Sequence, residues 1–185
     1  CRQALYIENH DEDRSVKSLG EKRSRAAAFL AAIIPDTMFI VNQGQENGWK
    51  IRPPMQINRF PAEVDNPQIQ KFYQKLFNII NSPIYKSGTV QNCQVNQISG
   101  DTIALRLLSA DEKSTAIFCL NISDSYSKCT IPEINKNTEI EIESLTEDKE
   151  IIPDSNRQNG IYIGLEPGEV QVIYYPNFTR IFDKI

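Results

Sequence analysis

The sequence of 185 residues contains little of what metal sites, membrane spans and nucleic-acid surfaces require. It has one histidine, and its four cysteines form no CxxC pair, so the usual zinc-binding patterns are absent. The longest apolar run, residues 26–34, is too short to cross a bilayer and is closed by Pro35. The chain has 24 Asp and Glu residues and 20 Lys and Arg residues, so its net charge is -4. No basic stripe with interleaved aromatic residues occurs. We therefore predict no metal, no cofactor, no nucleic acid and no membrane among the partners.

The four cysteines are Cys1, Cys93, Cys119 and Cys129. Cys119 and Cys129 flank a predicted turn and could face each other across a hairpin, which would permit a disulfide. Buried free thiols are the alternative, and we favour it because pairing cannot be deduced from sequence alone.

A hydrophobic content of 40% supports a folded core, and the N-terminal third alternates strand and helix patterns. A short apolar run at residues 5–7 is typical of a buried strand. Residues 20–34 place their large apolar side chains on one helical face, and residues 38–41 form a fully apolar run. This order predicts a strand–helix–strand unit of a parallel sheet. Residues 42–65 lack periodicity, which predicts a long functional loop.

Asp65 or Asn66 is predicted to cap a helix that ends near Ser82, where helical spacing gives way to short alternating runs. The predicted strands lie at residues 89–97, 102–108, 115–121, 128–131, 138–144, 160–164 and 169–175. Seven short strands separated by turn signals predict an antiparallel β-sandwich. We therefore predict one unit at residues 1–82 and a β-sandwich domain at residues 83–185.

The stretch from Leu5 to Arg14 carries the chemistry. An apolar strand ends there in seven consecutive polar or charged residues, among them the single histidine, His10, followed by Asp11. Ligands of open α/β sheets and α/β barrels bind at the carboxyl ends of strands. A charged surface turn is the simpler alternative, because Asp-rich turns are common.

Several motifs resemble the α-amylase family of glycoside hydrolases, in the order in which that family has them. They are Asn9-His10-Asp11 after a strand, an alanine-rich helix at residues 25–34, Gly44-Gln45-Glu46 after the next strand, Phe72-Tyr73-Gln74-Lys75-Leu76, and residues 166–173. The resemblance implies the last two strand–helix units of a (β/α)₈ TIM barrel, followed by an antiparallel β-sandwich. It also implies that the chain is the C-terminal piece of a longer enzyme that hydrolyses or transfers α-glucosidic bonds with retention.

The resemblance assigns roles to four residues. Asp11 matches the third catalytic carboxylate, which supports an oxocarbenium-like transition state. His10 matches a sugar-binding histidine, and Asn9 and Arg14 are predicted to bind substrate beside it. The nucleophile and the general acid would lie upstream, so the chain alone is expected to be inactive. An alternative is a non-catalytic carbohydrate-binding or structural β-module with a helical extension.

The neighbouring charges and aromatic residues leave further alternatives open. Arg14 is expected to neutralise part of the acidic cluster formed by Glu8, Asp11, Glu12 and Asp13, of which Glu8, Glu12 and Asp13 are expected to be solvated charges. Glu46 follows the second strand and either joins Asp11 in a two-carboxylate site or is structural, which we favour.

Trp49 and Arg52 are both candidates for sugar contacts. For Trp49 the alternative is that it plugs the rim of the barrel. Four tyrosines of the sandwich either form a carbohydrate platform or are sheet packing: Tyr126, Tyr162, Tyr174 and Tyr175.

Association is the last expectation from the sequence. Two strands cannot close a barrel, and unpaired strand edges recruit other chains. We therefore predict that the chain binds α-glucan or maltooligosaccharide and that it self-associates through its N-terminal third.

Overall fold

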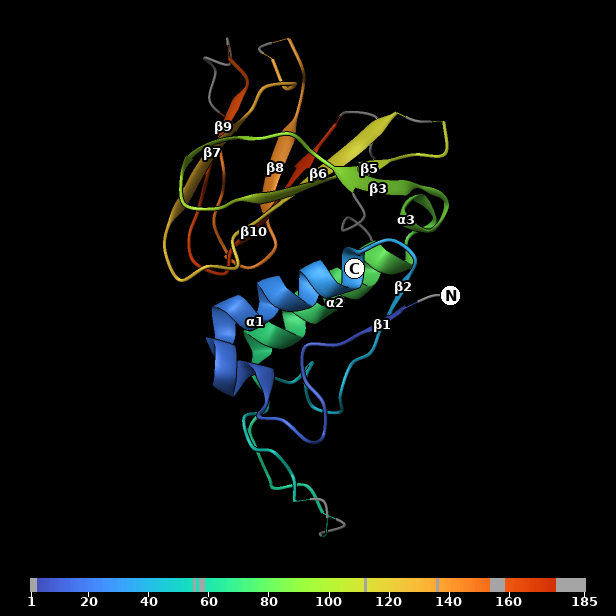
Figure 1. The fold of residues 1–185 in the computed structure, drawn as a ribbon, viewed down its shortest axis with the longest axis vertical. Coiled ribbons are helices and arrows are strands. Elements are labelled where there is room, and N and C mark those ends of the chain that lie inside the picture. Colours follow the sequence, from blue (N-terminus) through green and yellow to red (C-terminus); the bar gives the residue numbers. More distant parts are fainter. Residues whose placement is uncertain are drawn as a thin grey trace.

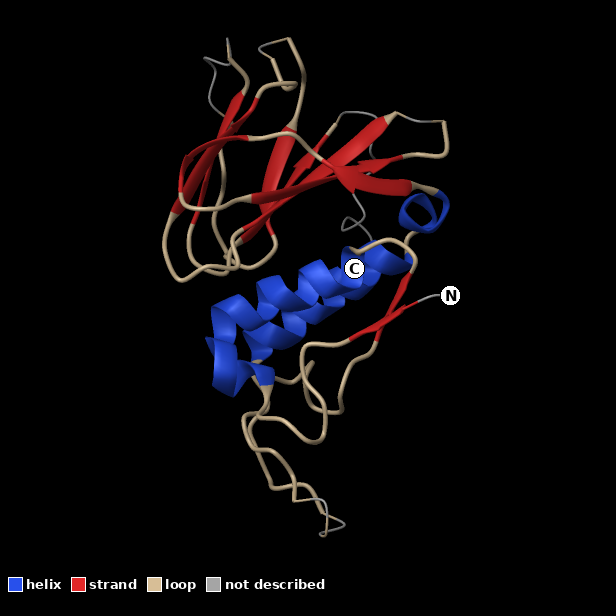
Figure 2. Ribbon diagram, in the orientation of Figure 1, coloured by secondary structure: helices blue, strands red, loops and turns tan. Residues whose placement is uncertain are grey.

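Two helices lie side by side between a short parallel sheet and a β-sandwich in the computed structural model (Figures 1 and 2). The structure describes residues 3–54, 56, 59–111, 113–135, 137–153 and 159–175. Strands β1 (Gln3–Leu5) and β2 (Thr37–Phe39) pair in parallel, with Leu5 opposite Phe39. Helix α1 connects them along the chain, which confirms the predicted strand–helix–strand order.

Helix α1 (Ser15–Ile33) begins five residues before the predicted start at Gly20. Gly20 has φ +79° and ψ 162°, so it bends the helix instead of starting it. The first turn is therefore contributed by residues that follow the acidic stretch directly.

Helix α2 (Pro67–Asn81) begins where the capping signal predicted. The Asn66 side chain accepts hydrogen bonds from the backbone N–H groups of Gln68 and Ile69. Pro67 occupies the first turn, where a backbone N–H group would have no acceptor within the helix, so the N–H group that proline lacks costs no hydrogen bond. The one-turn helix α3 (Pro83–Ser87) was not predicted. It is capped by Ser82, whose hydroxyl accepts from the N–H of Tyr85.

The rest of the described chain is an antiparallel β-sandwich, as predicted. A five-stranded sheet has the order β3-β5-β6-β10-β8, and a three-stranded sheet has the order β4-β7-β9. The bounds are β3 (Thr89–Asn92), β4 (Asn96–Ser99), β5 (Ile103–Leu108), β6 (Ser114–Leu120), β7 (Ser127–Ile131), β8 (Glu141–Ser144), β9 (Ile161–Leu165) and β10 (Val170–Tyr174). The single strand predicted at residues 89–97 is wrong, because it is divided between β3 and β4, which belong to different sheets.

Two apolar cores result, and the five-stranded sheet separates them. One lies between the two sheets and contains Cys93, Cys119 and Cys129 as free, buried thiols. This agrees with the free-thiol interpretation for these three residues, of which Cys119 is on β6 and Cys129 on β7 of the opposite sheet. Cys1 lies outside the described residues.

The other core lies between the helices and the outer face of the five-stranded sheet. Phe29 of α1 and Phe118 of β6 have ring centroids 5.3 Å apart, and the buried Arg25 donates a 2.6 Å hydrogen bond to the carbonyl oxygen of Thr146. Gly168 lies against the α1 backbone, because a Cβ there would be 2.3 Å from the carbonyl carbon of Lys22. The helices and the sandwich thus share one core across the predicted boundary at residue 82, and that boundary stays a prediction.

No helix in the described part of the chain has the length and apolar character that a membrane crossing needs.

Candidate functional site

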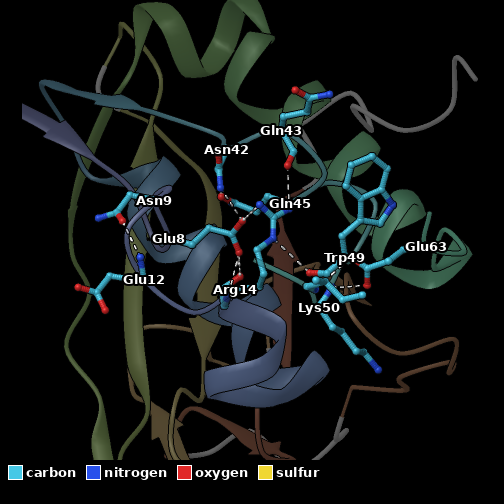
Figure 3. Close-up of polar contacts among 12 residues, drawn as sticks. Glu8, Asn9, Glu12, Arg14, Asn42, Gln43, Gln45, Trp49, Lys50 and Glu63 are labelled. Atoms are coloured by element: carbon cyan, nitrogen blue, oxygen red, sulfur yellow. Dashed lines mark hydrogen bonds and ion pairs between the residues drawn. The ribbon is translucent and has the colours of Figure 1, made fainter. Parts of the chain in front are cut away.

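A buried ion pair lies under the turn that follows β1 (Figure 3). Arg14 Nη1 is 3.1 Å from Glu8 Oε1, and the side chains are 1% and 0% exposed. The other carboxylate oxygen of Glu8 accepts hydrogen bonds from the N–H and the hydroxyl of Ser15, both at 2.7 Å. Ser15 is the first residue of α1, so Glu8 satisfies an N–H group at the start of the helix and places a negative charge at its positive end.

The expectation that Glu8 is a solvated charge is therefore wrong. The sequence names Arg14 as a partner for part of the acidic cluster, and the structure gives it Glu8, but the sequence does not show that this pair turns inward, because the two residues belong to no common helix or strand. Glu12 and Asp13 are exposed, and Asp13 pairs with Lys17 at 2.9 Å on the surface.

Arg14 also joins the turn after β1 to the loop after β2. Its Nη2 donates to the carbonyl oxygen of Gln43 at 2.7 Å, and its Nε donates to that of Trp49 at 3.4 Å. Asn42 adds a third connection, since its Nδ2 donates to Glu8 Oε1 at 3.3 Å. Nη2 and Nε thus donate hydrogen bonds to the protein, while Nη1 makes no hydrogen bond to the described residues and is held by the ion pair with Glu8, so the predicted contact of Arg14 with substrate stays a prediction. A direct contact would require the buried pair to open.

Asn9, His10 and Asp11 form one tight turn above this pair. Asn9 Oδ1 accepts hydrogen bonds from the backbone N–H groups of Asp11 and Glu12, at 2.8 and 3.0 Å. Figure 3 shows the contact with Glu12. The side chains of His10 and Asp11 are 70% and 61% exposed, and His10 Nε2 is 3.4 Å from Asp11 Oδ2. Three of the four predicted site residues therefore come together on a rigid turn that faces solvent, and Arg14 anchors it from below.

Arg52 reaches this turn from the long loop and donates a hydrogen bond to the backbone carbonyl of Asp11. This contact uses the backbone and leaves the Asp11 carboxylate unoccupied by Arg52. Asn9 holds the turn from within the segment that follows β1, and Arg52 holds it from the loop that follows β2. Both segments therefore contribute to the geometry of the turn.

Trp49 organises the loop after β2. A Cβ at Gly44 would be 2.0 Å from the indole ring, so only glycine permits this packing. The ring centroid is 5.9 Å from that of Phe60, and the indole N–H donates to Asp65 Oδ1 at 2.8 Å. These contacts hold Trp49 within the loop, and its two predicted roles, sugar contact and plugging the barrel rim, stay predictions.

Glu46 lies on the inner side of the same loop. One of its carboxylate oxygens is buried without a hydrogen-bond partner. The charge of Glu46 is one of the smaller causes that raise the pKa of Tyr73, which is raised mainly by burial, and the Tyr73 hydroxyl accepts a 2.7 Å hydrogen bond from Gln45. Because Asp11 is open to solvent while Glu46 has a buried carboxylate oxygen, the two carboxylates occupy different surroundings. We therefore keep the structural assignment of Glu46.

Among the described residues, no group of three or more His, Cys, Asp or Glu side chains is placed to hold a metal ion. The polar side chains at the carboxyl ends of β1 and β2 are instead arranged to present one imidazole and one carboxylate. Such a pair can hydrogen-bond hydroxyl groups and can stabilise positive charge.

Comparison with known proteins identifies the fold. No protein-family model matches the chain, and no curated protein matches it. Among solved structures, an α-amylase from H. orenii shares the fold with a TM-score of 0.65 and 19% identity, over 93% of this chain and 39% of that chain. A maltogenic α-amylase from Thermotoga neapolitana matches with a TM-score of 0.67 and 13% identity, over 93% of this chain and 41% of that one.

A debranching enzyme from Nostoc punctiforme matches with a TM-score of 0.58 and 15% identity, over 93% of this chain and 35% of that one. The chain thus has the fold of a part of α-amylase structures, as the motifs predicted. It spans about two-fifths of their length or less.

Proposed function

We propose that this chain is the C-terminal part of an α-amylase-like glycoside hydrolase or transglycosidase that acts on α-glucans. In this proposal residues 1–82 supply the last two strand–helix units of a (β/α)₈ barrel, and residues 83–185 form the C-terminal sandwich. The observation that carries it is the exposed Asn9-His10-Asp11 turn at the carboxyl end of a parallel strand, within a fold shared with α-amylases.

The substrate class is supported by two of the structural neighbours. An α-amylase from Geobacillus thermoleovorans is complexed with acarbose, and AmyP E221Q is complexed with maltotriose. A maltooligosaccharide is accordingly the ligand that we assign to the turn.

The proposed roles follow from the chemistry of glycosidic bond cleavage. The transition state develops positive charge on the sugar ring, and two carboxylates on earlier strands would serve as nucleophile and acid. Asp11 would accept sugar hydroxyls and stabilise that charge, while His10 would hydrogen-bond the same sugar. The Asn9 amide is engaged with the backbone, so its contribution would be to hold Asp11 in place.

The test is the variant Asp11→Asn in the intact protein, assayed by initial rates on maltooligosaccharides. Asn keeps the size of Asp11 but removes its charge, so we expect a loss of roughly a hundredfold or more, on the order of 3 kcal/mol. Glu12→Gln is the matched control, because it removes an exposed carboxylate one residue away and should leave the rate unchanged.

His10→Ala should reduce the rate less than Asp11→Asn, since it removes a sugar contact and no required charge. Thermal melts of all variants should agree with wild type, because both side chains are mostly exposed. Near-normal turnover of Asp11→Asn would make the segment a surface turn. An intact protein that binds but never cleaves maltooligosaccharides would instead favour the non-catalytic module.

A further inference from the structure

The backbone of the turn that carries Asp11 is held by side chains. In the described part of the chain, residues 6–13 form no backbone–backbone hydrogen bond, since the ladder between β1 and β2 ends at Leu5. The N–H of Asp11 donates to Asn9 Oδ1, and its carbonyl oxygen accepts a hydrogen bond from Arg52 Nη1. A segment without ladder contacts opens more easily than one inside a sheet. The orientation of Asp11 therefore depends on these two side chains.

Two arginines connect the turn to the loop after β2, and they do so in opposite directions. Arg14, from the segment of the turn, donates to the backbone carbonyl oxygens of Gln43 and Trp49 in the loop. Arg52, from the loop, donates to the backbone carbonyl oxygen of Asp11 in the turn. Arg14 is buried and Arg52 is exposed, so only the loss of Arg14 is expected to cost much stability.

The loop segment that leads to Arg52 has a fixed position. The backbone N–H groups of Lys50 and Ile51 donate to the two carboxylate oxygens of Glu63, at 2.7 and 3.0 Å, and Figure 3 shows the contact of Lys50 with Glu63. These contacts fasten the two residues that directly precede Arg52. Its side chain thus starts from an ordered backbone, so less conformational entropy is lost when it bonds to the turn.

We propose that Arg52 is a positioning residue, which orients the Asp11 carboxylate toward the sugar on which positive charge develops. This role rests on the proposed function. A hydrogen bond to the carbonyl oxygen fixes the peptide plane after Asp11, and with it the direction in which the side chain leaves the backbone. Because the guanidinium contacts the carbonyl, the carboxylate keeps its charge and its acceptor sites for the sugar. A displacement of about 1 Å can lower a rate roughly a hundredfold, so a small shift is measurable.

A direct sugar contact is the competing role for Arg52. Such a contact would act on substrate binding whether or not Asp11 has its charge. A positioning role acts through Asp11, so it should vanish once Asp11 has lost its charge. The two roles therefore differ in how the effect of an Arg52 substitution depends on a second substitution at Asp11.

The experiment measures kcat and KM of the intact protein on maltooligosaccharides for Arg52→Gln, Asp11→Asn and the double variant. Arg52→Gln should lower kcat about tenfold with little change in KM, because orientation matters most where charge develops. The double variant should be no slower than Asp11→Asn alone. Arg52→Lys should recover part of the loss, because an ammonium group also donates to a carbonyl.

Lys50→Met is the matched control. Lys50 is an exposed cation of the same loop, but its ammonium group pairs with Glu21 of α1, 2.8 Å away, and not with the turn. Its loss should leave kcat unchanged. Thermal melts of all Arg52 and Lys50 variants should agree with wild type, because both side chains are exposed.

A second measurement reports on the turn without catalysis. His10 is the only histidine of the chain, so its ring signals identify the turn in NMR spectra of the 185-residue chain. Arg52→Gln should shift these signals and speed hydrogen exchange of the Asp11 amide, whereas Lys50→Met should change neither. Unchanged signals and exchange in Arg52→Gln would show that the turn keeps its orientation without Arg52, which overturns the proposal.

The kinetic outcomes separate this proposal from the proposed function. A wild-type kcat in Arg52→Gln overturns it, and so does the same loss of rate in the Asp11→Asn background. A raised KM at unchanged kcat would assign Arg52 to the sugar, which also overturns it. A slow Asp11→Asn beside a normal Arg52→Gln rejects the positioning role alone. A normal rate in Asp11→Asn rejects the proposed function, and the positioning role with it.

Discussion

Replacement of Arg14 by methionine tests the buried pair that supports the candidate site. The guanidinium is 1% exposed and Glu8 is 0% exposed, so Arg14→Met leaves a carboxylate buried without its cation. Breaking a buried pair in this way typically destabilises a protein by about 3–5 kcal/mol, because the remaining charge has lost its compensation. Arg14→Met also removes the hydrogen bonds to Gln43 and Trp49, so a value in the upper part of that range is expected.

The measurement is urea unfolding of the wild type, Arg14→Met, Glu8→Gln and the double variant. The double variant has no uncompensated charge, so it should be more stable than the sum of the two single losses predicts, with a coupling energy of at least about 1.5 kcal/mol. Lys17→Met is the control, since Lys17 and Asp13 form an exposed pair in the same segment, and exposed pairs contribute only about 0–1 kcal/mol.

Two results would refute this reasoning. If Arg14→Met destabilises the chain no more than Lys17→Met, the pair is not sequestered from water. If the single losses add without coupling, Glu8 and Arg14 do not stabilise each other, and another contact anchors the turn.

Three further predictions concern packing, thiol reactivity and association. Gly168→Ala should destabilise the chain by about 1–3 kcal/mol more than Gly20→Ala, because both have positive φ but only Gly168 would push a Cβ into the α1 backbone; equal losses in urea melts would contradict the contact. Burial raises the pKa of the Cys119 thiol well above its usual value, so its thiolate population at pH 8 falls roughly tenfold for each unit of the shift, and native alkylation followed by mass spectrometry should leave it unmodified until urea unfolds the chain. Met38→Lys, on the exposed face of β2, should reduce self-association in sedimentation velocity, while Ile152→Lys, at a still more exposed position in a loop of the sandwich, should not.

Local signals predicted the elements whose structure depends on local chemistry. Asn66 caps α2 because a short side-chain acceptor precedes proline and an apolar stripe, and all of this is visible in the sequence. The apolar pattern of residues 20–34 likewise predicts a helix that begins at Gly20. The structure instead uses its positive φ to bend one helix, since the preceding residues are held in a helical turn by Glu8, a contact that no local pattern contains.

Long-range packing explains what could not be predicted. All five residues of β10 are buried, because the helices cover one face of its sheet and the three-stranded sheet covers the other. Sequence periodicity shows that a strand is apolar on both faces, but it does not show which elements cover each face. The change in pattern near Ser82 therefore suggested two units, whereas the helices and the sandwich share a core there.

That shared core gives the sandwich a connection to the candidate site. Gly168 and Thr146 contact α1 near Lys22 and Arg25, so the sandwich fixes the axis of this helix. The first residue of α1, in turn, donates two hydrogen bonds to Glu8. Glu8 directly precedes the turn that presents Asp11, and the contacts at the two ends of this connection are buried, with the bend at Gly20 between them. We infer that the sandwich keeps α1 in one orientation, and that α1 in turn keeps the Asp11 turn in place. A turn at a strand end without these contacts would not hold one orientation.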